Sequence, residues 1–419
     1  MFKQHDFAVV CRSPGIVRCA RLRDVNYTIL SPEDARALVP ELAQTRNPLM
    51  WVYRFVDDDN RWTLSIATHA PPGSGKLSLG GFRIVPEERQ RTPGFSTDVE
   101  AIALAMGMEE KVHWSRVIGV GGPLVMHDIH RIVGGKCVLA PTPEARIGQP
   151  DDAELLDFAI RCFKQAERDG GFLLTTGQDL GHGLMSDGAT QSLEYLNARY
   201  KGSAVADTSD LTAHGNYQIL KGMLRAFDIP LEDATVALIG CGNIGMHVIE
   251  RLQKHGTKMI ALEARAARRA EVEAMHIPTW TVEQKIEFLQ QPFDALVVNA
   301  SGGTLDAQTV DACVRNKQLK VICGCENLVM PDSSLVLVLR SARKVYAPTE
   351  LGGMMGYLTA AEEYLSRLEG VPLDRQSLVH AAEKLDEAGY EATRRIITSE
   401  HSETFEEAVT AIYGAGTAS

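Results

Sequence analysis

The chain has 419 residues, of which 45% are hydrophobic and 23% charged, as is typical of globular proteins with room for two domains. Its formal net charge of −11 argues against a nucleic-acid-binding protein, which usually carries a basic face. No run of about 18 apolar residues predicts a membrane span, and the first residues lack the pattern of a signal peptide. The eight cysteines form no C-x-x-C pair, so we expect reduced thiols and a cytoplasmic protein.

The first 200 residues mix strand and helix patterns. Runs rich in β-branched and aromatic residues predict strands at 7–11, 51–56, 62–68, 77–85, 137–140 and 172–176. Apolar residues at helical spacing predict helices at 98–111 and 151–169. Two similar glycine-rich pieces, 120–123 and 133–136, precede the strand that begins at Cys137.

From about residue 200 helix and strand patterns alternate. A helix at 212–227 precedes predicted strands at 235–239, 258–262, 295–299, 319–323 and 344–347, with helices such as 307–316 between them. This alternation predicts an α/β fold with a parallel sheet and right-handed crossovers. Two further helices are expected at 357–368 and 372–413.

Residues 235–250 join a strand pattern to a helix pattern through the spacing G-x-G-x-x-G. Gly240 allows a sharp turn, Gly242 lets the backbone approach a pyrophosphate, and Gly245 lets the helix pack against the strand. The free N–H groups at the helix start then bind phosphate. The motif predicts a doubly wound Rossmann domain; the alternative is a tight turn in an ordinary αβ unit.

The expected cofactor is NAD. The next predicted strand ends on Glu263, and an acid at this point binds the ribose hydroxyls and repels a 2′-phosphate. Arg265, Arg268 and Arg269 lie close by and favour the opposite choice, NADP. Loops at the carboxyl ends of later strands either contact the cofactor or are ordinary turns. The remaining expected cofactor contacts are Asn243, Ile244, Ala300, Ser301 and Asn327.

Four polar residues of the first domain have no evident structural role: Arg83, Lys111, Lys136 and Asp179. Lys136 follows two glycines and precedes an apolar strand, which suggests a dry cleft. Desolvation lowers the pKa of a lysine, so that it serves as a general base. The alternative for any one lysine is a solvated surface position.

Several short segments occur in a particular order along the chain: 78–83, 107–111, 134–136, 176–181, 210–215, 346–349, and Gly356 with 361–363. In these segments and in their order the chain resembles the glutamate/leucine/phenylalanine/valine dehydrogenase family, most closely its leucine and phenylalanine branch. The likeness extends over residues 62–368. In the family the glycine-rich piece around Lys136 is a loop.

The resemblance implies the chemistry of an NAD-dependent amino acid dehydrogenase. Lys111 would bind the substrate carboxylate, Lys136 would activate the water that attacks the iminium carbon, and Asp179 would exchange protons with the amine. Thr212 would lie beside the nicotinamide. The products of oxidative deamination would be a 2-oxo acid and ammonia.

The resemblance also implies two domains with a cleft between them. Residues 1–200 would form an α/β domain for substrate binding and homo-oligomer assembly, and 201–367 the Rossmann domain. Residues 368–419 would pack back on the first domain. The expected partners are small molecules and further copies of the chain, with no nucleic acid and no membrane.

The expected substrate has an apolar side chain, branched or aromatic. Leu79 precedes Gly80 and stands where the glutamate-specific branch has a lysine for the side-chain carboxylate. An uncharged wall disfavours an acidic side chain. Met355 is expected in the same pocket, together with Met354 and Tyr357.

Two departures from the family leave alternatives open. Lys111 and Lys136 are 25 residues apart rather than about a dozen, which we interpret as an insertion near 122–133; without it, Pro123 takes the place of the base. Gly353 replaces a usual asparagine. The alternatives are a cofactor-binding paralogue with a regulatory or structural role, and a dehydrogenase of a non-amino substrate.

The histidines leave smaller questions open. His127 and His130 have a metal-ligand spacing but no evident third ligand, so polar loop residues are favoured and no metal is expected. His182 and His214 lie beside predicted site residues. Each contacts substrate or is a hydrogen-bonded structural residue.

Overall fold

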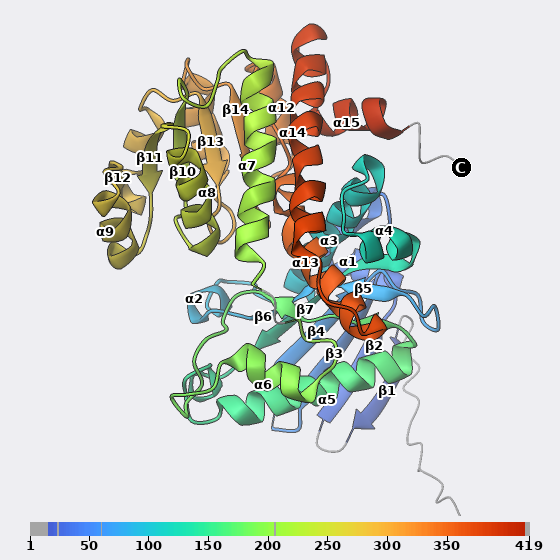
Figure 1. Ribbon diagram of the computed structural model, residues 1–419. Coiled ribbons are helices and arrows are strands. Elements are labelled where there is room, and N and C mark those ends of the chain that lie inside the picture. The colour runs from blue at the N-terminus through green and yellow to red at the C-terminus, as the bar shows by residue number, and fades with distance from the viewer. Residues whose placement is uncertain (1–15, 23–24, 60, 205–206, 415–419) are drawn as a thin grey trace, which may run out of the picture. The chain divides into compact units, whose positions relative to one another are not determined.

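A computed structural model describes residues 16–22, 25–59, 61–204 and 207–414, so the predicted strand at 7–11 lies outside the described residues. The chain divides into two compact units (Figure 1). Unit 1 comprises Met1–Val112, Asp128–Ala206 and Glu363–Gly370. Unit 2 comprises His113–His127, Asp207–Glu362 and Val371–Ser419.

Unit 1 is built on a mixed nine-stranded sheet with the order β1-β2-β3-β4-β7-β5-β8, and β6 joins β7 to β9. Strands β1 to β4 and β7 pair antiparallel, whereas β5 and β6 run parallel to β7. The strands are β1 (Ile16–Leu22), β2 (Val25–Leu30), β3 (Trp51–Asp57), β4 (Thr63–Thr68), β5 (Leu77–Leu79), β6 (Gly81–Ile84), β7 (Ile132–Ala140), β8 (Leu173–Leu174) and β9 (Gly177–Gln178).

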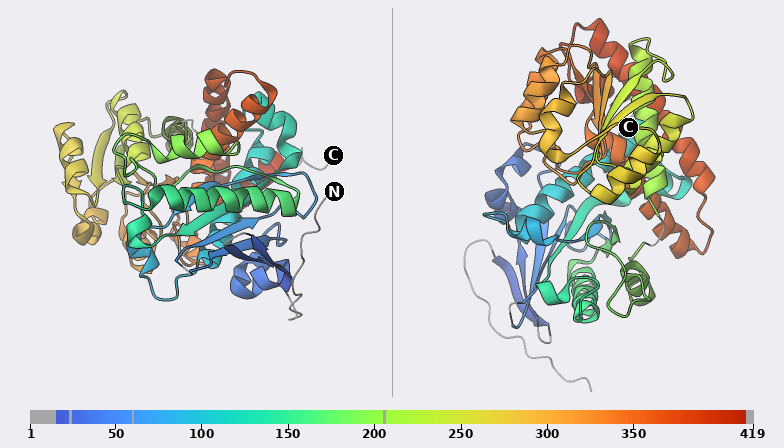
Figure 2. Two further views of the ribbon diagram at one scale, coloured as in Figure 1. Left: turned by 90° about the horizontal axis from the view of Figure 1, so that it is seen from below. Right: turned by 90° about the vertical axis from the view of Figure 1, so that its left-hand side faces the viewer.

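Helix α5 (Asp152–Gly170) lies across one face of this sheet (Figure 2). Its apolar residues recur at helical spacing and pack aromatic rings against the strands, with Phe158 on Trp62 and Phe163 on Phe82. The helix stops at Gly171, which takes the left-handed conformation. The other helices that begin in this part of the chain are α1 (Pro32–Leu38), α2 (Glu87–Gln90), α3 (Thr97–Ile118), α4 (Pro123–Asp128) and α6 (Ser192–Arg199).

Unit 2 contains a parallel six-stranded sheet with the order β12-β11-β10-β13-β14-β15 and helices on both faces (Figure 2). This is the strand order of a doubly wound dinucleotide-binding sheet, so the predicted α/β fold class is confirmed. The strands are β10 (Thr235–Ile239), β11 (Lys258–Leu262), β12 (Thr279–Trp280), β13 (Ala295–Val298), β14 (Val321–Gly324) and β15 (Val345–Tyr346).

The helices of the second half of the chain belong wholly or mostly to unit 2. They include α7 (Ser209–Ala226), α8 (Asn243–Gln253), α9 (Ala266–Ala274), α10 (Lys285–Leu289), α11 (Ala307–Arg315), α12 (Leu335–Ser341), α13 (Thr349–Glu369), α14 (Arg375–Thr398) and α15 (Phe405–Tyr413). No helix among the described residues is long and apolar enough to cross a membrane.

Two helices are longer than the sequence predicted. Helix α3 continues past Lys111 because Val112 and Trp114 extend its buried face, and it ends before Gly119, which has φ 74°. Helix α13 begins at Thr349, well before residue 357, and runs through Gly352 and Gly353. A Cβ at Gly352 would lie 2.0 Å from the backbone oxygen of Gly324, so this glycine serves close packing and does not break the helix.

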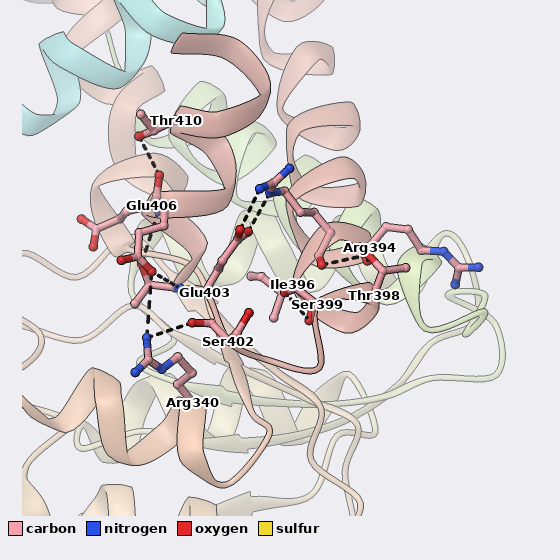
Figure 3. A network of polar contacts seen from close by, with 12 residues as sticks. Arg340, Arg394, Ile396, Thr398, Ser399, Ser402, Glu403, Glu406 and Thr410 are labelled. Atoms are coloured by element: carbon pink, nitrogen blue, oxygen red, sulfur yellow. Dashed lines mark hydrogen bonds and ion pairs between the residues drawn. The ribbon is translucent and has the colours of Figure 1, made fainter. Parts of the chain in front are cut away.

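The predicted helix at 372–413 is two helices. Helix α14 packs along α7 (Figure 1), and a Cβ at Gly222 would lie 1.9 Å from the backbone oxygen of Asp386. Arg395 and Glu403 make an ion pair of 2.6 and 2.7 Å across the turn to α15, where Arg340 also donates to the carbonyl of Ser402 (Figure 3). The return of residues 368–419 to the first domain stays a prediction, since the packing described for α14 is on α7.

Candidate active site

The glycine loop of unit 2 has the shape that the motif predicted. Gly240 has φ 87°, and a Cβ there would lie 2.7 Å from the backbone of Asn299. A Cβ at Gly245 would lie 2.2 Å from the backbone oxygen of Gly240, so only glycine lets α8 approach β10 this closely. Gly242 is the N-cap of α8 and provides no side-chain cap. The first N–H groups of α8, at Asn243 and Ile244, thus have no side-chain cap, as suits phosphate binding.

Glu263 follows β11 and turns its carboxylate toward this loop. It accepts hydrogen bonds from the backbone N–H of Cys241 at 2.7 Å and of Arg265 at 2.9 Å. Burial opposes ionisation, but these bonds and the Arg265 guanidinium lower the pKa of Glu263. The residue is therefore a carboxylate, which fits the ribose hydroxyls of a dinucleotide.

Each of the three arginines that favour NADP already has a partner within the protein. Arg265 pairs with Glu263 at 3.1 Å, and Arg268 pairs with Glu271. Arg269 donates to the backbone oxygens of Glu263 and Ala264, both at 2.7 Å. Of these three arginines, only Arg265 has a largely exposed side chain and also lies at the carboxylate of Glu263.

Two buried polar side chains that the sequence did not single out hold the loops after β13 and β14. Glu326 accepts hydrogen bonds from the N–H of Ala300 at 3.1 Å and from the N–H and hydroxyl of Thr304. Asn216 donates to the side-chain oxygen of Asn299 at 2.8 Å. The N–H of Ala300 is therefore used within the protein, while Ser301 is exposed and Asn327 half-buried. An acid directly after an apolar strand was the available signal for Glu326.

Thr212 and Met355 lie in the interior of unit 2. The Thr212 hydroxyl donates to the carbonyl of Thr208 at 2.6 Å, and a Cβ at Gly356 would lie 2.8 Å from that hydroxyl. Met355 is fully buried in α13, where a Cβ at Gly215 would lie 2.7 Å from it. The expected roles of Thr212 beside the nicotinamide and of Met355 in the substrate pocket stay predictions.

In unit 1 the structure brings Lys136 and Asp179 together. Lys136 is a central residue of β7, paired with Ala67 of β4, and not a loop residue before a strand as predicted. Its ammonium makes an ion pair with the carboxylate of Asp179, which follows β9. Their side chains are only 4% and 9% exposed. A Cβ at Gly81 would lie 2.9 Å from Nζ of Lys136, so glycine leaves room for the pair.

The electrostatics of the pair suit proton transfer. Burial lowers the pKa of Lys136, and the charge of Asp179 opposes that effect. Burial alone would raise the pKa of Asp179, but the charges of Lys136 and Arg83 hold it well below its usual range. A carboxylate and a lysine with a lowered pKa therefore share one dry site.

The segments that carry Leu79 and Lys111 pack against the strand of Lys136. Leu79 is 1% exposed and pairs with Gly134 of β7, and a Cβ at Gly80 would lie 1.8 Å from the backbone oxygen of Gly135. Helix α3 carries Lys111, which is buried, and its residue Glu109 accepts a hydrogen bond from the N–H of Gly134 at 2.6 Å. The glycines of β7 thus allow a helix and a strand to approach Lys136.

Between the two lysines, α3 ends at Ile118, and α4 and a 3-10 turn lead into β7. The carboxylate of Glu362 accepts hydrogen bonds from the N–H groups of Leu124 and Val125 at 3.0 and 2.8 Å. Pro123 begins this helix, whereas Lys136 lies beside Asp179. This arrangement supports the interpretation of an insertion.

The histidines make ordinary contacts. His182 bonds the carbonyl of Phe82 at 2.8 Å and the hydroxyl of Ser192 at 3.2 Å, and His214 bonds Gln218. His127 lies in α4 and His130 in the turn that follows. Among the residues that the structure describes, no group of three or more His, Cys, Asp or Glu side chains is placed to bind a metal ion.

One unit thus has the fold and loop of a dinucleotide-binding domain, and the other holds a buried acid–base pair on a separate mixed sheet. Solved structures that resemble this chain share its two-domain α/β fold. Residues 202–267 match the model of the Glutamate/Leucine/Phenylalanine/Valine dehydrogenase family. Over this part of its length the chain is similar to a family of amino acid dehydrogenases.

The relatives have low sequence identity to this chain, but the similarity extends over most of its length. The valine dehydrogenase of Streptomyces albus is 22% identical over 302 residues, 71% of this chain and 74% of the relative. The L-tryptophan dehydrogenase of Nostoc punctiforme has a TM-score of 0.57 and 18% identity, over 84% of this chain and 91% of that chain. The Leu-bound hetero-hexameric glutamate dehydrogenase of Thermus thermophilus has a TM-score of 0.60 and 16% identity, over 87% and 86%.

Proposed function

We propose that the protein catalyses the reversible, NAD-dependent oxidative deamination of an apolar L-amino acid, branched or aromatic, to its 2-oxo acid and ammonia. The observation that carries the proposal is the buried pair of Lys136 and Asp179, in a chain whose residues 202–267 match the model of the dehydrogenase family. A lysine with a lowered pKa beside a carboxylate is suited to move protons at neutral pH.

Each residue has one task in this proposal. Lys111 pairs as a cation with the substrate carboxylate. Lys136 removes a proton from the water that attacks the iminium carbon, and Asp179 exchanges protons with the amine. A nicotinamide bound at the loop of Gly240 and at Glu263 would supply the oxidation or reduction of the substrate carbon.

An assay of NADH oxidation with a panel of 2-oxo acids, with and without ammonia, tests the function. We expect oxidation that requires both ammonia and an apolar 2-oxo acid. Oxidation that does not need ammonia would indicate a dehydrogenase of a non-amino substrate. Cofactor binding without turnover on any acid would indicate a regulatory or structural paralogue.

The cofactor preference is a separate prediction. We expect kcat/KM to be higher with NAD than with NADP, because the Glu263 carboxylate repels a 2′-phosphate. The Glu263→Gln variant should narrow the preference, while Glu271→Gln, at the exposed partner of Arg268, should leave it unchanged. A preference of the native protein for NADP above about tenfold would refute this assignment of Glu263.

We also expect a homo-oligomer that assembles through the strands of the first domain. Strand β1 ends the described order of that sheet, and edge strands are common sites of pairing between chains. Light scattering should give a mass of several subunits at micromolar concentration; a mass of 45.8 kDa would contradict the prediction. A cytoplasmic location remains a prediction.

A further inference from the structure

A row of alternating charges runs through the interior of unit 1 behind Lys136. Oδ2 of Asp179 pairs with Lys136 and also lies 3.4 Å from Nε of Arg83. NH1 of Arg83 pairs with Glu100 at 2.7 Å, and Glu100 in turn pairs with Arg89 at the surface. The side chains of Arg83 and Glu100 are 7% and 2% exposed.

Arg83 and Glu100 come from different elements than the proposed catalytic pair. Arg83 lies in β6 and Glu100 in α3, whereas Lys136 lies in β7 and Asp179 follows β9. Burying two more charges at this point is costly unless they are paired and hydrogen-bonded. The same Asp179 oxygen serves both Lys136 and Arg83, so any change in Arg83 alters how Asp179 holds the lysine.

We propose that Arg83 and Glu100 are positioning residues that set the protonation of Lys136 through Asp179. Arg83 orients the Asp179 carboxylate and draws part of its charge away from the lysine. Glu100 holds the guanidinium in place and partly neutralises it. The inference deepens the proposed function and rests on it for the catalytic meaning of Lys136.

Asp179 and Arg83 exert the largest charge effects on Lys136. Cys137 and His182 also interact electrostatically with Lys136. Helix α3, which packs against β7, carries the ionisable residues Glu109 and Lys111. Burial raises the pKa of the Cys137 thiol, which stays protonated. Burial lowers the pKa of His182, which stays uncharged.

The two positioning residues should therefore act with opposite signs. Without the positive charge of Arg83, the Asp179 carboxylate interacts with Lys136 alone, and the pKa of the lysine rises. Removing the negative charge of Glu100 leaves the charge of Arg83 without its partner and therefore lowers the pKa of Lys136. A charge at this range shifts a pKa by about 1–3 units, and Glu100, farther along the row, should have the smaller effect.

The test is a direct titration of Lys136 in the full chain, labelled with 13C at Cε of lysine. Its NMR signal is assigned by its loss in the Lys136→Ala variant. We expect the midpoint to rise by about 1–3 pH units in Arg83→Gln and to fall by a smaller amount in Glu100→Gln. Arg83→Lys keeps the charge and should keep the midpoint close to that of the native protein.

Arg61→Gln is the matched control, since Arg61 is an arginine of unit 1 whose ion pairs are with Asp57, Asp59 and Glu154. It should leave the midpoint unchanged. Shifts of the same sign in Arg83→Gln and Glu100→Gln, or no shift in either, would overturn the proposal. If the Arg83→Gln variant does not fold, the Glu100→Gln variant is sufficient as a test. The proposal is then overturned if the titration midpoint of Lys136 in Glu100→Gln is not lower than in the native protein.

The titration needs no turnover, so it separates this inference from the proposed function. Opposite shifts in a protein that shows no ammonia-dependent activity would retain the charge network and reject the dehydrogenase. In an active enzyme, the acid limb of the kcat/KM profile should move in the same directions as the NMR midpoint. A limb that does not follow the midpoint would overturn the link between this network and catalysis.

Discussion

The Lys136→Ala variant should lower kcat by about 10²–10⁴-fold while the protein remains folded. Lys136 is buried in a strand and is paired with Asp179, so truncating it removes the proposed general base from the site. Asp179→Asn should cause a loss of the same order because the amide cannot accept a proton. Steady-state kinetics with ammonia and a 2-oxo acid measure both effects.

A binding variant, a control variant and a stability measurement separate catalysis from substrate binding and from damage to the fold. Lys111→Ala should chiefly raise KM, because a carboxylate partner contributes to substrate binding. Lys201→Ala, at an exposed position of the same unit, should leave both constants unchanged. Urea unfolding of each variant shows how much stability is lost, since Arg83 still faces Asp179 when the lysine is removed. Near-full activity of a folded Lys136→Ala variant would reject the insertion interpretation and the general base with it.

The 2-oxo acids of leucine, valine, phenylalanine or tryptophan type should outperform 2-oxoglutarate by about 10²–10³-fold in kcat/KM. Leu79 is buried and uncharged at the position that carries a lysine in the glutamate-specific branch. An acidic side chain buried against it without a partner costs several kcal/mol, and each 1.4 kcal/mol is a factor of about ten. Among apolar substrates the differences should be smaller, at about 1–3 kcal/mol per methylene.

The Leu79→Lys variant tests the same position in reverse. It should gain activity on 2-oxoglutarate and lose activity on apolar 2-oxo acids, whereas Leu79→Met, of similar volume and no charge, should keep the native preference. Lys76 lies nearby in sequence and is half-buried, so Lys76→Ala serves as a further control. If 2-oxoglutarate is the best substrate of the native protein, Leu79 does not line the pocket.

Unit 2 could be predicted closely because its signals are local. Each strand of a parallel sheet is buried on both faces and therefore appears as a continuous apolar run with a glycine or polar residue after it. Strand β11 was predicted at 258–262 and lies at Lys258–Leu262. The motif from Gly240 to Gly245 predicted a turn, a close helix contact and a dinucleotide loop from six consecutive residues.

The sequence by itself thus determined the α/β class, the Rossmann loop, and the two residues of unit 1 proposed for proton transfer. Only the tertiary structure decided that Lys136 lies inside a strand and that Arg83 and Glu100 stand behind Asp179. Glycines near Lys136 indicated a loop because glycine is usually a sign of flexibility. Here Gly134 and Gly135 instead make room for α3 and β5, and such room depends on residues far away in sequence, which no local pattern contains.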